Sequence, residues 1–360
     1  MNIMFFDATR QWTGGAYRVL LFSSELRRRG HNVIVGCLPG SDMSKRLANE
    51  GIPYFTLEPK SDVNLFVVPE IVRKIREHRI DILDIHSPKF YWIGLIAARI
   101  EGKPVMITRN VPFRKYGLKK KINSMLYGKF IDRVVSVSEK VKREMMEDYD
   151  LRNDQVDVVF DGLDLSRFNA QESAERNDPQ GPLKVGNVSR LVYGKGLECL
   201  LDAIPEIVKS IPDIGFFIAG EGQIEEELKE RAKKLGIDGR VTFVGFSNDI
   251  PGFLAGMDIT VLPSPDEGMS MFALESMASA VPIVVTTGTG LVDIITDMED
   301  GVIVQRDDPK ALAEGVIRLL KSDYHAIGRK AREVIRENFD TQRVIDRYES
   351  LVASVADRRR

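Results

Sequence analysis

Short apolar runs alternate with longer amphipathic segments along almost the whole chain. The short runs are rich in β-branched and aromatic residues, which favour strands, whereas the longer segments repeat their apolar residues at helical spacing. This alternation predicts βαβ units built around parallel sheets. The expected strands are Asn2–Phe6, Val33–Cys37, Ile82–Ile85, Val105–Thr108, Arg133–Val137, Gln155–Val159, Leu183–Val188, Ile214–Ala219, Val241–Gly245, Ile259–Pro263, Ile283–Thr286 and Gly301–Val304. The expected helices include Ala16–Arg29, Val68–His78, Ile224–Leu235, Met271–Ala280, Pro309–Leu320 and Thr341–Ala356.

The alternation breaks between residues 169 and 182, where the chain is polar, contains proline and glycine, and lacks periodicity. Such a stretch is typical of a linker. A chain of 360 residues also suits two domains of about 150 residues each. We therefore predict two doubly wound, Rossmann-like α/β domains, residues 1–168 and 183–340. Open sheets of this kind bind ligands at the carboxyl ends of their strands, so we expect the site in a cleft between the halves.

Composition and charge narrow the class of protein. No stretch approaches the ~20 apolar residues of a membrane span, and Asp7 interrupts the first apolar run, which reads as a strand and not as a signal peptide. Cys37 and Cys199 lie in apolar stretches and are expected to be buried free thiols, which favours a cytoplasmic protein. Residues 1–170 hold 28 basic and 21 acidic residues (+7), and the remainder holds 23 and 32 (−9). The basic front half predicts an anionic partner, either a phosphate-bearing acceptor or a membrane surface.

Residues 264–275 carry the clearest candidate chemistry. They follow a predicted strand and open a helix, and the backbone N–H groups and positive end of such a helix form a cradle for phosphate. Gly268 permits a close approach of the backbone to a ligand. Glu267 and Glu275 can accept hydrogen bonds from sugar or ribose hydroxyls. The alternative is two solvated acids near a helix start.

Residues 189–196 form a second candidate loop, between the strand Leu183–Val188 and a helix. Arg190 offers a planar fork for phosphate oxygens, and Lys195 offers a compact charge. Together these cations can stabilise a departing diphosphate. Solvated surface cations are the alternative interpretation.

These segments, in this order, resemble the donor site of the family-four retaining glycosyltransferases (glycosyltransferases group 1), which have the GT-B fold of two doubly wound domains facing across a cleft. Glu267 and Glu275 match that family's pair of spaced glutamates, and Arg190 and Lys195 match its diphosphate-binding pair. The further matches are Gly14-Gly15, Gly220-Glu221-Gly222 and Asp161-Gly162-Leu163-Asp164 with Phe168, where Asp161 stands in place of the usual Asn.

The resemblance implies a role for each matched residue. Glu275 would hold the donor ribose, and Glu267 would contact the donor sugar. The backbone of Gly14-Gly15 would close over the diphosphate, which Arg190 and Lys195 neutralise. The other residues implied on the donor side are Gly220, Glu221, Gly268, Met269 and Ser270. His86, at the end of a predicted strand, would face the acceptor, and the terminal segment 341–360 would cross back onto the first domain.

One position departs from the family's pattern. The family commonly has His in the loop after the strand Val105–Thr108, and Asn110 fills that position next to Arg109. Asn can hydrogen-bond a sugar hydroxyl but takes up no proton at neutral pH. Activity is still expected, because stabilisation of the leaving group can dominate such a reaction. Asn110 is therefore placed with the catalytic candidates Glu267, Arg190 and Lys195, and Arg109 with the acceptor side.

The segment Arg114–Phe130 has six basic residues, no acidic one, and apolar residues interleaved among them. It suits peripheral attachment to anionic lipid or binding of a phosphorylated, lipid-linked acceptor. A helix with one buried and one solvated basic face is the alternative. No nucleic-acid-binding motif accompanies the charges. We also find no His-x-x-x-His or Cys-x-x-Cys spacing and no G-x-G-x-x-G after a strand, so neither a metal nor a nicotinamide cofactor is expected.

The sequence thus predicts a metal-independent retaining glycosyltransferase that needs no cofactor besides its nucleotide-diphosphate-sugar substrate. The expected acceptor is a lipid-linked or cell-surface glycan, as in lipopolysaccharide or polysaccharide assembly, at the inner face of the membrane. Two alternatives stay open. A nucleotide-sugar epimerase of GT-B fold would need acid and base groups around the sugar, and the chain has four histidines. A non-catalytic nucleotide- or glycan-binding subunit is favoured by Asn110 alone.

Overall fold

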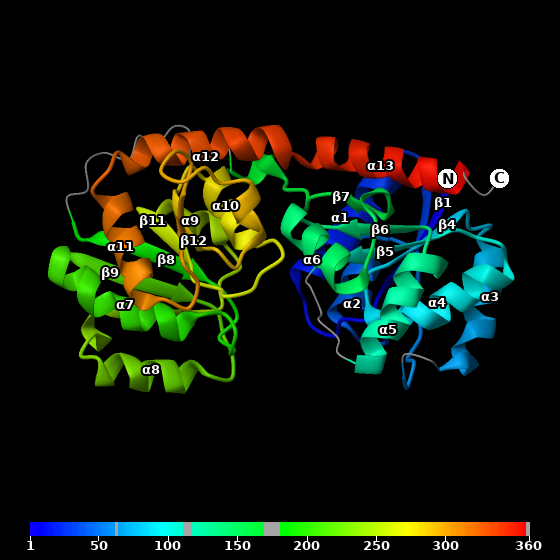
Figure 1. The fold of residues 1–360 in the computed structure, drawn as a ribbon, viewed down its shortest axis with the longest axis horizontal. Helices are drawn as coiled ribbons and strands as arrows, with labels where there is room; N and C mark the ends of the chain where they lie inside the picture. The colour runs from blue at the N-terminus through cyan, green and yellow to red at the C-terminus, as the bar shows by residue number, and fades with distance from the viewer. Residues whose placement is uncertain (62–63, 111–116, 169–180, 358–360) are drawn as a thin grey trace. The chain divides into compact units, whose positions relative to one another are not determined.

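Strands and helices alternate through the chain as the sequence pattern predicts (Figure 1). The computed structural model describes residues 1–61, 64–110, 117–168 and 181–357. They form two units, one of Met1–Gly162 with the terminal segment from Thr341, and one of Leu163–Asp340. The division falls between Gly162 and Leu163, whose N–H donates to Phe339 O. The linker predicted at 169–182 lies mostly outside the described residues, so the predicted domain bounds stay a prediction.

Among the described residues, the first unit is built on a seven-stranded parallel sheet in the order β3-β2-β1-β4-β5-β6-β7. Its strands are β1 (Asn2–Asp7), β2 (Asn32–Cys37), β3 (Tyr54–Thr56), β4 (Ile82–Ile85), β5 (Val105–Arg109), β6 (Arg133–Ser136) and β7 (Val156–Val158). Its helices are α1 (Gly14–Arg28), α2 (Asp42–Asn49), η1 (Leu65–Val67), α3 (Val68–Glu77), α4 (Pro88–Ile100), α5 (Gly117–Met125), η2 (Leu126–Phe130), α6 (Glu139–Tyr149), η3 (Asn153–Gln155) and α13 (Thr341–Asp357).

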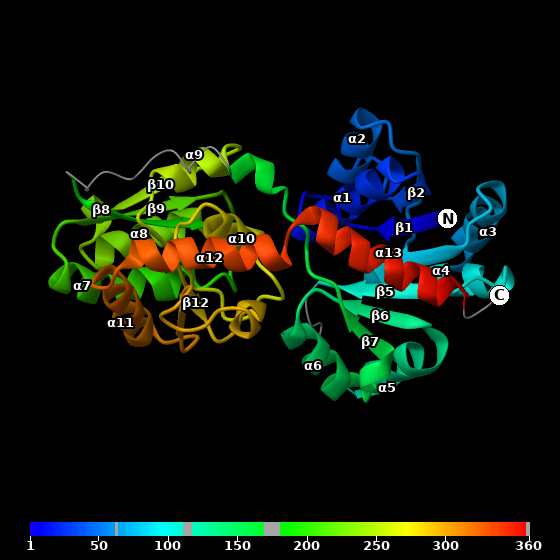
Figure 2. The same cartoon turned by 90° about the horizontal axis from the view of Figure 1, so that it is seen from above.

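The terminal helix α13 belongs to the first unit. Together with α1 it covers one face of the sheet, where Val344, Ile345 and Tyr348 pack into the core around Phe5 (Figure 2). This apolar stripe recurs at helical spacing, which is why the sequence pattern reveals the helix.

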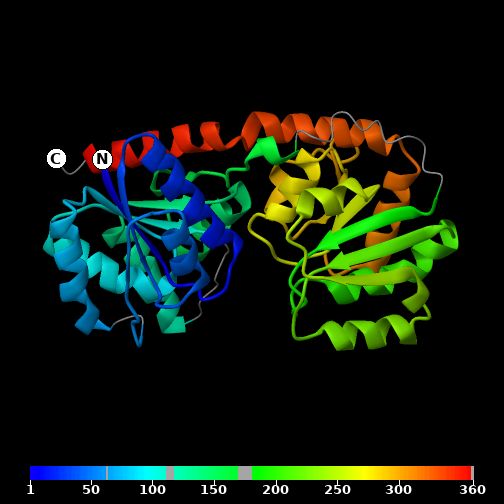
Figure 3. The ribbon, with the colours of Figure 1, turned by 180° about the vertical axis from the view of Figure 1, so that it is seen from behind.

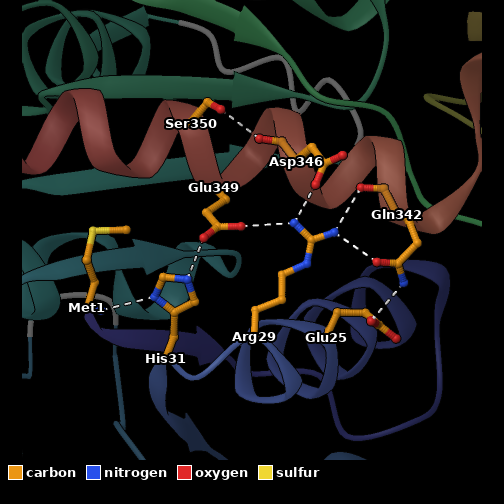
Figure 4. Close-up of polar contacts among 8 residues, drawn as sticks. All are labelled: Met1, Glu25, Arg29, His31, Gln342, Asp346, Glu349 and Ser350. Carbon is orange, nitrogen blue, oxygen red and sulfur yellow. Dashed lines mark hydrogen bonds and ion pairs between the residues drawn. The ribbon is translucent and has the colours of Figure 1, made fainter.

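Polar contacts continue along the edge of α13 (Figure 4). The Arg29 guanidinium donates to Asp346 Oδ1 at 2.5 Å and to Glu349 Oε2 at 2.9 Å, and His31 Nε2 lies 2.7 Å from Glu349 Oε1. Residues more than three hundred positions apart are therefore joined by both an apolar face and a charged edge.

The second unit has a six-stranded parallel sheet, counted over the described residues, in the order β10-β9-β8-β11-β12-β13. Its strands are β8 (Leu183–Val188), β9 (Ile214–Ala219), β10 (Val241–Gly245), β11 (Ile259–Leu262), β12 (Ile283–Thr286) and β13 (Val302–Val304). Its helices are α7 (Leu197–Ser210), α8 (Glu225–Lys234), η5 (Asp238–Arg240), α9 (Ile250–Ala255), α10 (Met271–Ala278), η6 (Gly290–Asp293), α11 (Pro309–Leu320) and α12 (Tyr324–Asn338). Helices α7, α8 and α11 pack on one face, and α10 and α12 lie on the other (Figure 3).

Each sheet has one point at which the order of the strands reverses. In the first sheet it lies between β1 and β4, and in the second between β8 and β11. Loops that leave neighbouring strands on opposite sides of such a point diverge and leave a crevice at the carboxyl edge. The fold therefore confirms the predicted pair of doubly wound sheets and marks two positions for ligand binding. The sequence pattern missed only the short edge strand β3 among the described strands.

Candidate active site

The reversal point of the second sheet brings together two of the predicted residues. Lys195 lies in the loop after β8, and Glu267 lies in the loop after β11. Lys195 Nζ is 2.6 Å from Glu267 Oε2, and the side chains are only 21% and 16% exposed. A partly buried ion pair at the carboxyl edge of a doubly wound sheet is the arrangement expected of a site for a charged ligand.

Glu267 is held by its backbone. Its N–H donates to Gly288 O at 3.1 Å, and its carbonyl accepts from Gly290 N at 3.0 Å. Thr289 between them is buried and donates its hydroxyl to Thr286 O at 3.1 Å. The loop after β12 is thus a fixed support for the Glu267 loop. This support was not predicted from the sequence, although a Gly-containing stretch directly after a buried strand is a signal for it.

Glu275 lies on α10, which Ser270 caps by accepting a hydrogen bond from Ala273 N at 3.4 Å. Gly268 and Met269 are buried in the turn before this helix. Burial raises the pKa of the Glu275 carboxyl to about 7, and the nearby charge of Arg167 opposes the shift. A half-buried carboxyl of this kind gains from ligand hydroxyls that donate hydrogen bonds to it.

The loop after β9 packs against the loop after β8. Gly220 has a φ of +133°, and a Cβ at this position would lie 1.9 Å from Ser189 O, so only glycine fits. Leu191 N donates to Glu221 O at 2.9 Å. Arg190 stands between these two anchors with an exposed side chain. The second sheet thus brings Arg190, Lys195, Gly220, Glu221 and Glu267 to loops after neighbouring strands.

The first unit carries the other predicted residues, at its own reversal point. Gly14 and Gly15 begin α1, whose cap Thr13 accepts a hydrogen bond from Ala16 N at 3.2 Å. A Cβ at Gly15 would lie 2.3 Å from Asn110 Nδ2, so the Asn110 amide packs directly against the glycine backbone. The position that departs from the family pattern therefore touches the glycine pair that opens the helix.

His86 follows β4 but points into the interior. Its side chain is 1% exposed, and Nε2 lies 3.3 Å from Asp84 Oδ2. Asp84 also accepts from Thr108 Oγ1 at 2.9 Å and from the Tyr348 hydroxyl at 2.6 Å. Burial acts to raise the pKa of Asp84, but His86 and these hydrogen bonds hold it below its ordinary value. The contact of Asp84 with Tyr348 was not predicted from the sequence, because the two residues are distant in the chain.

Replacing Tyr348 with Phe is expected to destabilise the first unit by about 1 to 3 kcal/mol, since a buried carboxylate loses one hydrogen bond. Both tryptophans, Trp12 and Trp92, lie in this unit, so urea unfolding followed by their fluorescence measures the change. The control is Tyr54→Phe, because Tyr54 is 40% exposed on β3. Equal stabilities of the two variants would show that the bond to Asp84 contributes nothing.

Arg109 is buried in the first unit, with only 3% of its surface exposed. Its Nη1 donates to the Tyr91 hydroxyl at 3.0 Å, beside Tyr127 and Tyr149, whose ring centroids lie 4.9 Å apart with the rings tilted at 56°. The guanidinium is thus placed among aromatic side chains, and the predicted acceptor-side role of Arg109 stays a prediction.

The described part of the chain contains no group of three or more His, Cys, Asp or Glu side chains able to hold a metal ion. Over the same residues, no helix has the length and apolar character to cross a membrane. Residues 114–116 of the predicted basic region lie outside the described residues, and the remainder forms α5 and the π-helical turn η2.

Two family models match consecutive parts of the chain. Residues 12–167 match the model for Glycosyltransferase Family 4, and residues 169–339 match the model for Glycosyl transferases group 1. The chain belongs to this family of glycosyltransferases. The predicted family is therefore confirmed.

Known proteins that resemble the transferase agree with this assignment. An uncharacterised glycosyltransferase of Methanocaldococcus jannaschii is 28% identical over 324 residues, which is 82% of either chain. The UDP-Gal:alpha-D-GlcNAc-diphosphoundecaprenol alpha-1,3-galactosyltransferase of Escherichia coli is 24% identical over 298 residues, or 78% of this chain and 77% of the relative. The crystal structure of Anabaena HepE in complex with UDP matches with a TM-score of 0.87 at 20% identity, across 98% of this chain and 100% of that one. The transferase thus has the GT-B fold that the sequence predicts.

Proposed function

We propose that this glycosyltransferase moves a sugar from a nucleoside diphosphate sugar to a hydroxyl of a glycan or lipid-linked acceptor, with retention of the anomeric configuration and without a metal ion. The observation that carries the proposal is the ion pair of Lys195 with Glu267 at the reversal point of the second sheet. Lys195 is a cation that can bind phosphate, and Glu267 is a hydrogen-bond acceptor for hydroxyls. The two lie where doubly wound sheets bind nucleotides.

The proposed chemistry is mainly electrostatic. As the bond between the sugar and the phosphate loosens, negative charge develops on the leaving diphosphate. Arg190 and Lys195 and the positive end of α10 stabilise that charge. Glu275 accepts hydrogen bonds from the ribose, and Glu267 accepts them from the sugar. The acceptor hydroxyl attacks from the face that the diphosphate leaves and gives its proton to an oxygen of the departing diphosphate, so the configuration is retained and Asn110 need not take up a proton.

The names of the relatives support the kind of donor and acceptor. The Escherichia coli enzyme takes UDP-Gal and a sugar linked to diphosphoundecaprenol, and the Anabaena structure contains UDP. We therefore propose a UDP sugar as the first donor to test and a polyisoprenyl-diphosphate glycan, of the kind used in polysaccharide or lipopolysaccharide assembly, as the acceptor.

A turnover assay tests this function. The protein is incubated with UDP-, GDP-, ADP- and TDP-sugars in the presence of EDTA, and the release of nucleoside diphosphate is measured with and without a diphosphopolyprenyl glycan. We expect acceptor-dependent release from one nucleotide series, and a product whose anomeric configuration, measured by NMR, equals that of the donor. Binding of a nucleotide without any turnover would favour the non-catalytic alternative that Asn110 suggests.

The basic segment supports contact with the membrane that carries such an acceptor. Around α5 and η2, the apolar side chains of Ile122, Met125 and Phe130 are 38%, 43% and 38% exposed, and Lys121 and Lys129 are exposed beside them. We expect the protein to co-sediment with vesicles that contain anionic lipid, and salt to weaken this binding. Replacement of Lys121 and Lys129 by Gln should reduce it severalfold. Equal binding to neutral vesicles would contradict the membrane role.

A further inference from the structure

The proposed donor site contains a counter-ion of its own. Lys195 Nζ and Glu267 Oε2 are 2.6 Å apart, and both side chains are largely removed from solvent. Arg190 differs, because its side chain is exposed and its guanidinium makes no ion pair within the described residues. One of the two candidate phosphate-binding cations is thus already neutralised by a carboxylate of the same site.

The two charges face each other from fixed positions. Ser264 Oγ donates to Lys195 O at 3.5 Å, which joins the loop after β8 to the loop after β11. The backbone of Glu267 is bound on both sides to the loop after β12, through Gly288 and Gly290. The Glu267 carboxylate therefore stays in the site when a ligand binds, even if the ligand has no group that can donate a hydrogen bond to it.

We propose, on the basis of the proposed function, that Glu267 makes the enzyme prefer the sugar-loaded donor over the free nucleoside diphosphate. A free diphosphate that takes over Lys195 displaces Glu267 from it, and the carboxylate then stays largely buried beside further negative charge. The loss of its ammonium partner and the added repulsion both destabilise the buried carboxylate. Leaving a desolvated charge without its partner costs more free energy than a solvent-exposed ion pair contributes.

A nucleoside diphosphate sugar avoids this cost. Its sugar hydroxyls donate hydrogen bonds to the Glu267 carboxylate and so replace the ammonium that the diphosphate takes over. Selectivity then arises from a group that repels the competitor as well as from contacts to the correct ligand. The same repulsion acts on the nucleoside diphosphate left after transfer, and it favours release of that product.

The test compares Glu267→Gln with the wild-type protein by isothermal titration with UDP and UDP-galactose, or with the nucleotide pair that the turnover assay identifies. We expect E267Q to bind UDP about tenfold more tightly. Its affinity for the UDP sugar should stay equal or fall, so the preference for the sugar-loaded form is lost. Unchanged or weaker UDP binding by E267Q would overturn the inference.

A matched control removes the same charge one residue away. Asp266 is exposed, and Asp266→Asn should leave both affinities within about twofold of the wild type. Thermal unfolding confirms that each variant is folded.

A second variant is independent of E267Q: Lys195→Gln should weaken binding of the UDP sugar more than binding of UDP, because UDP gains little from a cation that is already paired. An equal loss for both ligands would contradict the proposal.

The two hypotheses fail in different ways. If wild-type protein binds no nucleotide at all, the proposed function fails and this inference fails with it. If wild-type protein binds and turns over a donor while E267Q keeps the wild-type ratio of affinities, only the inference is wrong. The salt dependence adds a further readout, since UDP binding to E267Q, with its unpaired Lys195, should weaken more steeply with salt than binding to wild type.

Discussion

Replacing Asp161 with Asn is expected to destabilise the first unit by about 3 kcal/mol. Arg18 Nη1 donates to Asp161 Oδ1 at 2.8 Å and to Phe160 O at 2.7 Å, and the side chains of this pair are 0% and 9% exposed. The guanidinium carbon also lies 4.2 Å from the centre of the Phe22 ring. Without the carboxylate, the positive charge of Arg18 stays in the core with no counter-ion.

Asp161 is the position at which the family usually has Asn, and in this chain its carboxylate pairs with Arg18. Tryptophan fluorescence during urea unfolding measures the loss. The double variant Arg18→Met with Asp161→Asn removes both charges and should recover most of the stability. The control is Asp154→Asn, because the pair of Arg152 with Asp154 is 71% exposed on both sides and should contribute less than about 1 kcal/mol. Equal effects at the two sites would contradict a buried charge pair.

Replacing Glu275 with Gln is expected to stabilise the second unit by up to about 3 kcal/mol at pH 8 and by little below pH 4.5. Burial raises the pKa of this carboxyl from 4.5 to about 7. Between these values the unfolded chain has released a proton that the folded protein still holds, so stability falls as the pH rises through this window. Above pH 7 the full cost of the buried charge is present, and Gln does not carry it.

Urea unfolding at pH 4.5 and pH 8, followed by circular dichroism, measures this effect. Glu333 on α12 is exposed, and Glu333→Gln should give the same small change at both pH values. A gain for E275Q that does not depend on pH would contradict a raised pKa.

The same variant should bind nucleotide more weakly, because a neutral amide is a poorer acceptor for ribose hydroxyls than a carboxylate. Stability kept low for the sake of binding is common at functional sites.

The sequence pattern predicted those features that depend on neighbours in the chain. Short apolar runs rich in β-branched and aromatic residues revealed the strands, and apolar residues at helical spacing revealed α13, because burial on a sheet or along one face of a helix leaves a local pattern. The loops with Lys195 and Glu267 were also identified, since each directly follows a buried strand. The two side chains meet because β8 and β11 are neighbours in the second sheet. No local sequence pattern shows this order of the strands.

Contacts between distant residues could not be predicted in this way. Asp84 appears in the sequence as one polar residue within a strand, and its partner Tyr348 is far along the chain. Asn110 likewise shows no sign of its contact with Gly15. His86 follows β4 and Arg109 ends β5, at the strand ends where site residues are expected, yet the structure turns both side chains into the first unit. Position at a strand end thus predicts a place near a site but not the direction of a side chain.

We propose that Arg190, Lys195 and Glu275 form a binding site for a nucleoside diphosphate. Its most direct test is the thermal unfolding of the wild-type protein with millimolar UDP, GDP, ADP, TDP or CMP in the presence of EDTA. A ligand that binds only the folded state adds about 2.7 kcal/mol of stability at a hundred times its Kd. We predict a clear rise in Tm with one nucleoside diphosphate, and the loss of that rise in a variant with both Arg190→Ala and Lys195→Ala. No rise with any of the nucleotides, or an equal rise in that variant, would contradict a nucleotide site at these residues.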